Sequence, residues 1–451
     1  MLGFDGKGAS DAGGTEKPFH RAAGLQGALF AGLQWTDSPL GLEIVGAGLA
    51  RSSLASRRSE GGLQSAWVFL GASGSRLDHP RASDPPYFLR AGFMPLLSDP
   101  MGLLYSGYRP AVHFGYRARI GQLSWLGLEF LAMDLSDDSP YFARGYATGA
   151  ARYYETAVSW WIDRFELRLS HGVYDLRGRS ALPEGRFMDA KLWEGQQSLP
   201  DQYIHYSGLA LRFNGEVFRA DLQAYQSWGQ LAQIESGVEE FLSRKTVRGW
   251  LVALRTRWIL GEEGLQDLGA SGLGSSRNRK DGQDFHGFAP LSPEPTIMGG
   301  YSSIFLTSRP AFDQSHSYSN RRFFDSFPTA AASNEGRIVN RQLEESGSVL
   351  TIPDHANRGI RMGGLEAGLG FRGMGGDFRI FLNWAEFRES QGTEGILQFS
   401  AHLPLEARLV LGMAGASVVP ARETPDPYTG FIPSSKSRYF SRYSVSLFFC
   451  Y

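Results

Sequence analysis

The sequence predicts an all-β protein, a transmembrane antiparallel up-and-down β-barrel. Three observations lead to this: apolar residues recur at every second position, glycine and aromatic residues are abundant, and the chain ends on an aromatic, strand-like segment. The 451 residues include 56 glycines and 13% aromatics, with a mean hydropathy of only −0.24. No stretch approaches the roughly 18 consecutive apolar residues of a transmembrane helix. A barrel fits because only alternate residues of each strand face lipid.

Alternation with a period of two is the main sign of strands. In residues 164–173, the positions from Phe165 to Leu169 alternate between apolar and charged side chains, and the same pattern runs through 250–258 and 377–385. Most such segments span roughly 9–14 residues, which suits tilted strands that cross a hydrocarbon core. Strands of soluble sandwiches are usually shorter, at about 5–6 residues. The segment lengths therefore favour a membrane barrel.

Connections between the segments alternate in length. We expect tight turns near Gly121, Asp163 and Pro404. We expect longer polar loops at 136–147, 177–202, 227–245, 272–297 and 420–437. Short turns on one side and long loops on the other are typical of bacterial outer-membrane barrels.

The strand count is predicted as 18, with 16 as the alternative. About 16 segments are clear from the alternation, and an additional pair is expected at 265–272 and 298–308. An even number places both chain ends on the same, periplasmic side.

The chain is predicted to be one barrel with a short leading segment. Residues 1–20 are glycine-rich and polar, without the apolar core of a signal peptide, so we expect a flexible periplasmic segment of a mature, exported chain. Residues 21–451 form the barrel, with long loops that include 274–297 and 309–358. Part of 301–357 is expected to fold into the barrel as a constriction or to cap its outer mouth.

The chain end carries an assembly signal. Tyr443, Leu447, Phe449 and Tyr451 share one strand face. This pattern resembles the C-terminal recognition signal of bacterial outer-membrane proteins. The resemblance implies that the barrel-assembly machinery binds the last strand, and that the outer membrane with its lipid surrounds the barrel.

The residues between the apolar ones line the lumen if the apolar face meets lipid. Arginines dominate that face, and the acids that we assign to it are fewer. The arginines are Arg90, Arg117, Arg119, Arg164, Arg168, Arg212, Arg219, Arg255, Arg257, Arg372, Arg379 and Arg408. Arginine presents a planar fork for carboxylate or phosphate, so a passage for small anionic solutes or acidic saccharides is one interpretation. The other is a set of arginine–glutamate ladders that stabilise the wall and constrict the pore.

Two segments resemble the alginate-export family of outer-membrane barrels. Ala270-Ser271-Gly272, then Asp281-Gly282, then a Phe-rich stretch up to Pro290-Leu291 are similar to a strand, turn and Phe-x-Pro-Leu-like element of that family. Residues 88–93 look like its Leu-x-Val-Gly-Arg strand, without the final arginine. The resemblance implies an 18-stranded monomeric barrel with an arginine-rich lumen that passes an acidic polysaccharide.

Other functions have weaker support in the residues. A plugged barrel could act as a binding or assembly component of an envelope complex, and a barrel with a serine–histidine pair could be an outer-membrane hydrolase. The nine histidines are scattered without the spacing of a catalytic or metal site, and Cys450 is the single cysteine. We therefore expect no enzyme activity, no cofactor, no metal and no nucleic-acid partner.

Overall fold

The fold is known from a computed structural model. It describes residues 2–4, 24–37, 40–53, 57–71, 85–134, 150–177, 202–235, 241–260, 266–276, His286, Phe288, Leu291, 296–300, 303–307, 361–371, 376–386, 390–403, 407–420 and 438–449. Within these residues, no helix is long and apolar enough to cross a membrane.

Almost all of the described residues lie in long strands. The strands are β1 (Leu2–Phe4), β2 (Gly24–Asp37), β3 (Leu40–Ser53), β4 (Arg57–Gly71), β5 (Tyr87–Leu97), β6 (Ser106–Arg119), β7 (Ser124–Asp134), β8 (Ala150–Ile162), β9 (Phe165–Arg177), β10 (Gln202–Asn214), β11 (Phe218–Glu235), β12 (Phe241–Leu260), β13 (Gln266–Ser275), β14 (Arg361–Phe371), β15 (Gly376–Glu386), β16 (Ser390–Leu403), β17 (Ala407–Pro420) and β18 (Arg438–Phe449). A short helix, α1 (Ile304–Thr307), lies between β13 and β14.

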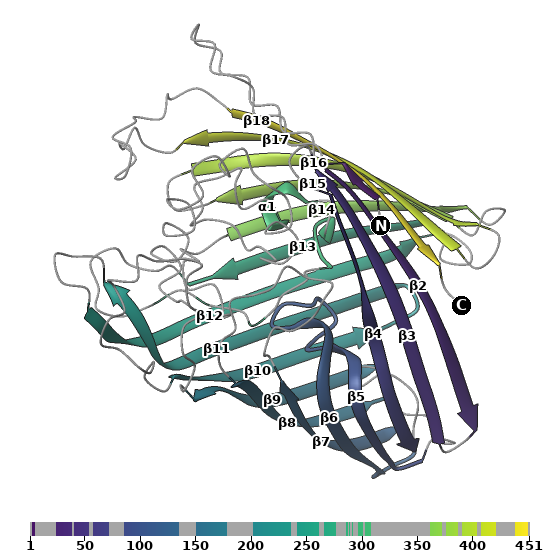
Figure 1. Cartoon of the computed structure of the whole chain (residues 1–451), viewed down its shortest axis with the longest axis vertical. Helices are drawn as coiled ribbons and strands as arrows, with labels where there is room; N and C mark the ends of the chain where they lie inside the picture. Colours follow the sequence, from purple (N-terminus) through teal and green to yellow (C-terminus); the bar gives the residue numbers. More distant parts are fainter. Residues whose placement is uncertain are drawn as a thin grey trace, which may run out of the picture.

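The strands form one antiparallel sheet in which chain neighbours are also neighbours in space from β2 to β18, as Figure 1 shows. β1 pairs with β18, with Leu2 opposite Val445, and also lies against β2. The sheet therefore closes on itself, and the described residues hold 18 strands. Closure matters because each unpaired backbone group in lipid costs several kcal/mol.

Two expectations about the strands are wrong. Residues 2–4 belong to the leading segment that we expected to be flexible, yet they form β1, which is too short to show an alternation. The described residues of 298–308 do not form a strand: positive φ angles at Met298, Gly299 and Gly300 turn the chain there, and α1 occupies Ile304–Thr307. β1 therefore replaces the expected strand at 298–308 in the count of 18. The other strand of that expected pair, at 265–272, is present as β13.

The predicted loop at 227–245 is also wrong. β11 continues to Glu235 and β12 begins at Phe241, and the two strands remain paired over this whole extension. Polar residues occupy both alternating positions there, so the period-two signal is lost although the strands continue.

The predicted alternation of faces is confirmed for the described strands. Leu128 and Leu382 point outward and are 58% and 61% exposed, whereas their neighbours Glu129 and Asn383 point inward and are buried. Aromatic rings also gather on the outward face near the short turns. Phe165 contacts Phe213, Phe213 contacts Phe218, and Phe218 contacts Trp258, with centroids 4.7, 6.2 and 5.3 Å apart. The outward wall is therefore an apolar belt with an aromatic girdle.

Two segments enter the ring and pack against its inner wall. The first, 98–105, joins β5 to β6, and the second comprises the described residues of 286–307. Leu103, Phe288 and Phe305 are fully buried among inward side chains. Thr296 Oγ1 donates to Pro100 O at 3.1 Å, which joins the two segments. Residues 303–307 thus lie inside the barrel, as expected for part of 301–357; the predicted loop at 309–358 lies outside the described residues.

Candidate functional site

The predicted lumen arginines fall into three groups. Arg90, Arg117 and Arg168 are packed into one side of the inner wall, on β5, β6 and β9. Arg212, Arg255, Arg257 and Arg379 lie on β10, β12 and β15 with part of each side chain accessible. Arg119, Arg164 and Arg219 lie exposed at the short-turn ends of strands. Arg372 lies outside the described residues, and of Arg408 only the strand pairing with His402 and Phe448 is described.

The first group forms a sealed ladder. Arg168 donates to Glu129 at 2.9 Å and to Glu155 at 3.3 Å, and Arg117 lies 3.8 Å from Glu129. The guanidinium groups of Arg90 and Arg117 lie over the Phe88 ring, at 5.2 and 5.3 Å. Because the Arg117 and Arg168 side chains are only 5% exposed, these two arginines stabilise the wall and present almost no charge to a solute.

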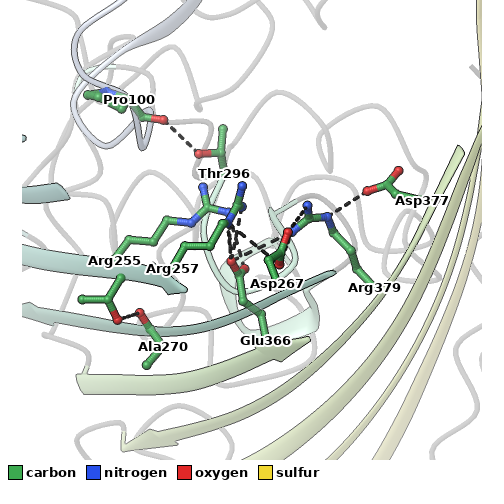
Figure 2. A network of polar contacts seen from close by, with 10 residues as sticks. Pro100, Arg255, Arg257, Asp267, Ala270, Thr296, Glu366, Asp377 and Arg379 are labelled. Carbon is green, nitrogen blue, oxygen red and sulfur yellow. Dashed lines mark hydrogen bonds and ion pairs between the residues drawn. The ribbon is translucent and has the colours of Figure 1, made fainter. Parts of the chain in front are cut away.

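The second group centres on Glu366 of β14, and Figure 2 shows three guanidinium groups converging on it. Arg255 Nη2 and Arg257 Nη2 lie 3.2 and 3.3 Å from Glu366 Oε1, and Arg379 Nη1 lies 3.9 Å from the same atom. Asp267 Oδ2 accepts from Arg379 Nη2 at 3.1 Å. We call Arg255, Arg257, Arg379, Glu366 and Asp267 the Glu366 cluster.

Accessibility within the Glu366 cluster is unequal. The Glu366 side chain is 3% exposed and that of Asp267 12%, whereas the three arginines are each 20–23% exposed. The carboxylates therefore lie beneath a layer of guanidinium groups. Gly269 provides the space for this, since a Cβ there would lie 2.5 Å from Glu366 Cγ. The surface that faces the lumen here is positive although the charges below it are paired.

Arg212 extends this accessible side along β10. It lies 3.1 Å from both Glu166 and Asp221, and its side chain is 13% exposed. The packed segment 98–105 borders it, because Ser98, Asp99 and Pro100 line a small cavity together with Arg212 and Asp221. The inward segment thus lies directly against the charged wall.

Two of the predicted lumen arginines are wrong. Arg119 donates to Gly121 O at 3.0 Å and to Gln122 O at 2.6 Å, so it closes its own turn. Arg164 lies in the turn between β8 and β9 and pairs with Glu216 of the next turn at 2.5 Å. The alternation predicts an inward side chain at both positions, but Arg119 is the last residue of β6 and Arg164 lies in a turn, so both side chains are exposed.

Among the residues that the structure describes, arginines do not outnumber acids on the inward face, contrary to the prediction. The structure adds Asp267, Asp377 and Glu394 to that face, and Asp99 through the inward segment. Asp377 and Asp267 are each the second residue of their strand, where the alternation pattern is weakest. Within the Glu366 cluster the arginines are more accessible than the carboxylates with which they pair, whereas Asp377 and Asp221 are themselves 30% and 25% exposed.

Buried carboxylates hold both inward segments in place. Asp99 accepts hydrogen bonds from Tyr225 Oη at 2.9 Å and from the backbone N–H groups of Met101 and Leu103. Burial raises the pKa of the Asp99 carboxyl, and these hydrogen bonds act in the opposite direction. Glu394 of β16 accepts from Ser303 Oγ and Phe305 N, both at 2.9 Å. The constriction is therefore anchored to the wall on two sides.

The predicted assembly signal lies on β18. Tyr443, Leu447 and Phe449 pair in register with Met413, Leu409 and Ala407 of β17, while Tyr451 lies outside the described residues. Its binding to the assembly machinery stays a prediction.

The closed sheet, the outward apolar belt and the aromatic girdle define this chain as a transmembrane β-barrel of the outer-membrane type. No family model matches the chain, and no curated protein matches it. Membership of the alginate-export family therefore stays a prediction.

Several solved structures are similar to this chain. OccAB1 of Acinetobacter baumannii is 9% identical with a TM-score of 0.47, over 99% of this chain and 94% of that chain. OccK8 (OprE) of Pseudomonas aeruginosa is 11% identical with a TM-score of 0.45, over 96% and 94%. Wzi, an outer membrane protein involved in group 1 capsule assembly in Escherichia coli and a carbohydrate-binding β-barrel, is 10% identical with a TM-score of 0.42, over 100% and 85%.

Proposed function

We propose that this chain is a porin-like channel of the bacterial outer membrane that passes small anionic solutes, with acidic saccharides as the favoured class. The observation that carries the proposal is the Glu366 cluster, in which accessible guanidinium groups cover nearly buried carboxylates. A wall of one charge sign in a narrow, low-dielectric passage concentrates solutes of the other sign.

The inward segments direct a solute in the lumen toward the Glu366 cluster. In Figure 2, Arg255 and Arg257 point toward the side on which the Thr296–Pro100 contact lies. The segments 98–105, 296–300 and 303–307 narrow the lumen, so a solute that enters must pass close to the accessible arginines. This placement supports selection by charge in addition to size.

The chemistry of the cluster suits a carboxylate with neighbouring hydroxyl groups. A guanidinium group can bind a carboxylate through two parallel N–H···O hydrogen bonds. Asp377, which accepts from Arg379 Nε at 2.8 Å and is 30% exposed, offers an acceptor for sugar hydroxyls beside it. The resemblance to the alginate-export family points to the same class, a saccharide with carboxylate groups.

Efflux from proteoliposomes tests the proposal. Radiolabelled glucuronate should leave roughly tenfold faster than glucose, since the two differ in charge but little in size. Glucosamine, a cation of similar size, should be the slowest of the three. Equal rates for all three sugars, or fastest efflux of glucosamine, would contradict the proposal that the channel selects anions.

Each of the two alternative functions, a plugged barrel and a hydrolase, is supported by one specific observation. The buried inward segments favour a plugged barrel that serves as a binding or assembly component; vesicles that retain all three sugars would support it. For a hydrolase, Ser207 Oγ lies 3.0 Å from His171 Nδ1, on the outward wall. Phospholipid hydrolysis by the purified barrel that disappears in Ser207→Ala would support that function.

A further inference from the structure

The outward wall carries a polar group of side chains toward its long-loop end. His171 of β9, His205 of β10, Trp228 of β11 and Arg248 of β12 form it, and we call them the outer-wall cluster. They share the outward parity of the exposed Leu169 on β9 and of Val252 on β12. The cluster therefore faces the membrane and not the lumen, and the proposed channel does not use it.

The aromatic part of the cluster is built from stacked rings. The His205 ring is nearly parallel to the Trp228 ring, with centroids 5.4 Å apart and planes at 9°. The His171 ring lies 5.6 Å from Trp228. His171 Nε2 lies 3.4 Å from His205 Nδ1, and His171 Nδ1 lies 3.0 Å from Ser207 Oγ. Two imidazoles are thus held together at fixed positions on a rigid sheet.

Arg248 is the cation of the cluster. It lies directly opposite Trp228 in the β11–β12 register and is exposed, and it forms no ion pair with any residue that the structure describes. The outward cation Arg361, at the same end of the barrel, lies 3.7 Å from Glu386. A third outward cation, Arg152, stands opposite Asp175 in the register of β8 and β9. Arg248 thus differs from both in having no acid beside it among the residues that the structure describes.

Arg248 lies on the lipid-facing wall, and this location limits which groups can solvate its charge. A charge on the lipid-facing wall is strongly unfavourable at the middle of the bilayer and tolerated near the headgroups. Tryptophan, tyrosine and arginine together are typical of that interfacial level, and Tyr203 lies against His205 at 5.7 Å. The anionic groups available at this level belong to lipids, and the commonest of them are phosphates.

We propose that the outer-wall cluster binds the phosphate of a membrane lipid headgroup in the leaflet next to the long loops. Arg248 would supply a bidentate contact to two phosphate oxygens, the geometry that guanidinium groups favour. The imidazoles of His171 and His205 add ring N–H donors beside Arg248. Trp228 supports the rings and contacts the apolar part of the lipid below the headgroup.

Native mass spectrometry of the detergent-solubilised full chain tests this site. Phosphatidic acid, a lipid phosphomonoester, is titrated against wild type, Arg248→Gln and Arg361→Gln, with phosphatidylcholine of the same acyl chains as the comparison lipid. Wild type should retain phosphatidic acid intact and more tightly than phosphatidylcholine. Arg248→Gln should weaken its binding about five- to tenfold, the effect of one charge-assisted contact, and Arg361→Gln should leave it unchanged.

Three results would overturn the proposal. These are equal binding by Arg248→Gln and wild type, an equal loss in Arg361→Gln, and equal binding of the two lipids to wild type. Displacement of phosphatidic acid by inorganic phosphate would overturn the assignment to a lipid. The heat-dependent shift in electrophoretic mobility that folded barrels show serves as the folding check. His171→Asn with His205→Asn is a second variant, which should weaken binding without removing the arginine.

Discussion

Glu366→Gln is expected to lower the free energy of unfolding by about 3–5 kcal/mol, the cost of removing one partner from a buried charge network. The carboxylate of Glu366 is nearly buried and contacts Arg255, Arg257 and Arg379. Without its charge, three guanidinium groups would face one another with Asp267 as their remaining buried acid. Glutamine keeps the size of the side chain, so packing changes little.

Urea unfolding in phospholipid vesicles, followed by tryptophan fluorescence, measures this effect. Glu216→Gln is the matched control, because Glu216 pairs with Arg164 in exposed turns. Exposed ion pairs contribute about 0–1 kcal/mol, so the control should stay near wild type. Similar stability of Glu366→Gln and wild type would mean that the cluster does not hold the wall together.

Replacing Arg255 and Arg257 together by glutamine is expected to reduce the anion-to-cation permeability ratio by roughly tenfold. Two unit charges at about 6 Å from a passing ion in water contribute on the order of 1.4 kcal/mol. Their removal leaves Glu366 with Arg379 as its arginine partner and uncovers a carboxylate that now favours cations. The double variant therefore both removes positive charge and exposes negative charge.

The reversal potential of the channel in a KCl gradient measures this ratio. Arg119→Gln is the control, since Arg119 closes the β6–β7 turn and lies away from the Glu366 cluster. An unchanged reversal potential in the double variant would show that ions do not pass these arginines.

The wall of the barrel could be predicted from the sequence because the pleat of a strand is local. Every second residue of a strand faces the same side of the sheet. The sides that Leu128 and Glu129 face can therefore be predicted without knowing which residues they contact. Lipid makes the apolar requirement strict along the whole outward face, which strengthens the signal. The same reasoning placed Arg255, Arg257 and Arg379 on the inward face.

Features that depend on distant partners could not be predicted. The three residues of β1 are a strand only because β18 and β2 lie beside them. The turn at Met298–Gly300 and helix α1 stand where a strand was expected. Buried contacts, such as the hydrogen bond from Phe305 N to Glu394, stabilise this conformation of the segment. The pairing of Arg379 with Asp267 joins residues 112 apart in sequence. The alternation predicts which side of the sheet a residue faces, but it predicts neither the residue that it contacts nor its solvent accessibility.

Single-channel recording in a planar bilayer tests the central claim, a passage lined by accessible arginines. Purified wild-type chain in a KCl gradient should give discrete conductance steps, with a reversal potential shifted toward the equilibrium potential of chloride. A bilayer without steps would contradict the open passage and support a plugged barrel. Steps with a reversal potential on the potassium side would contradict the guanidinium-covered surface as the selecting element.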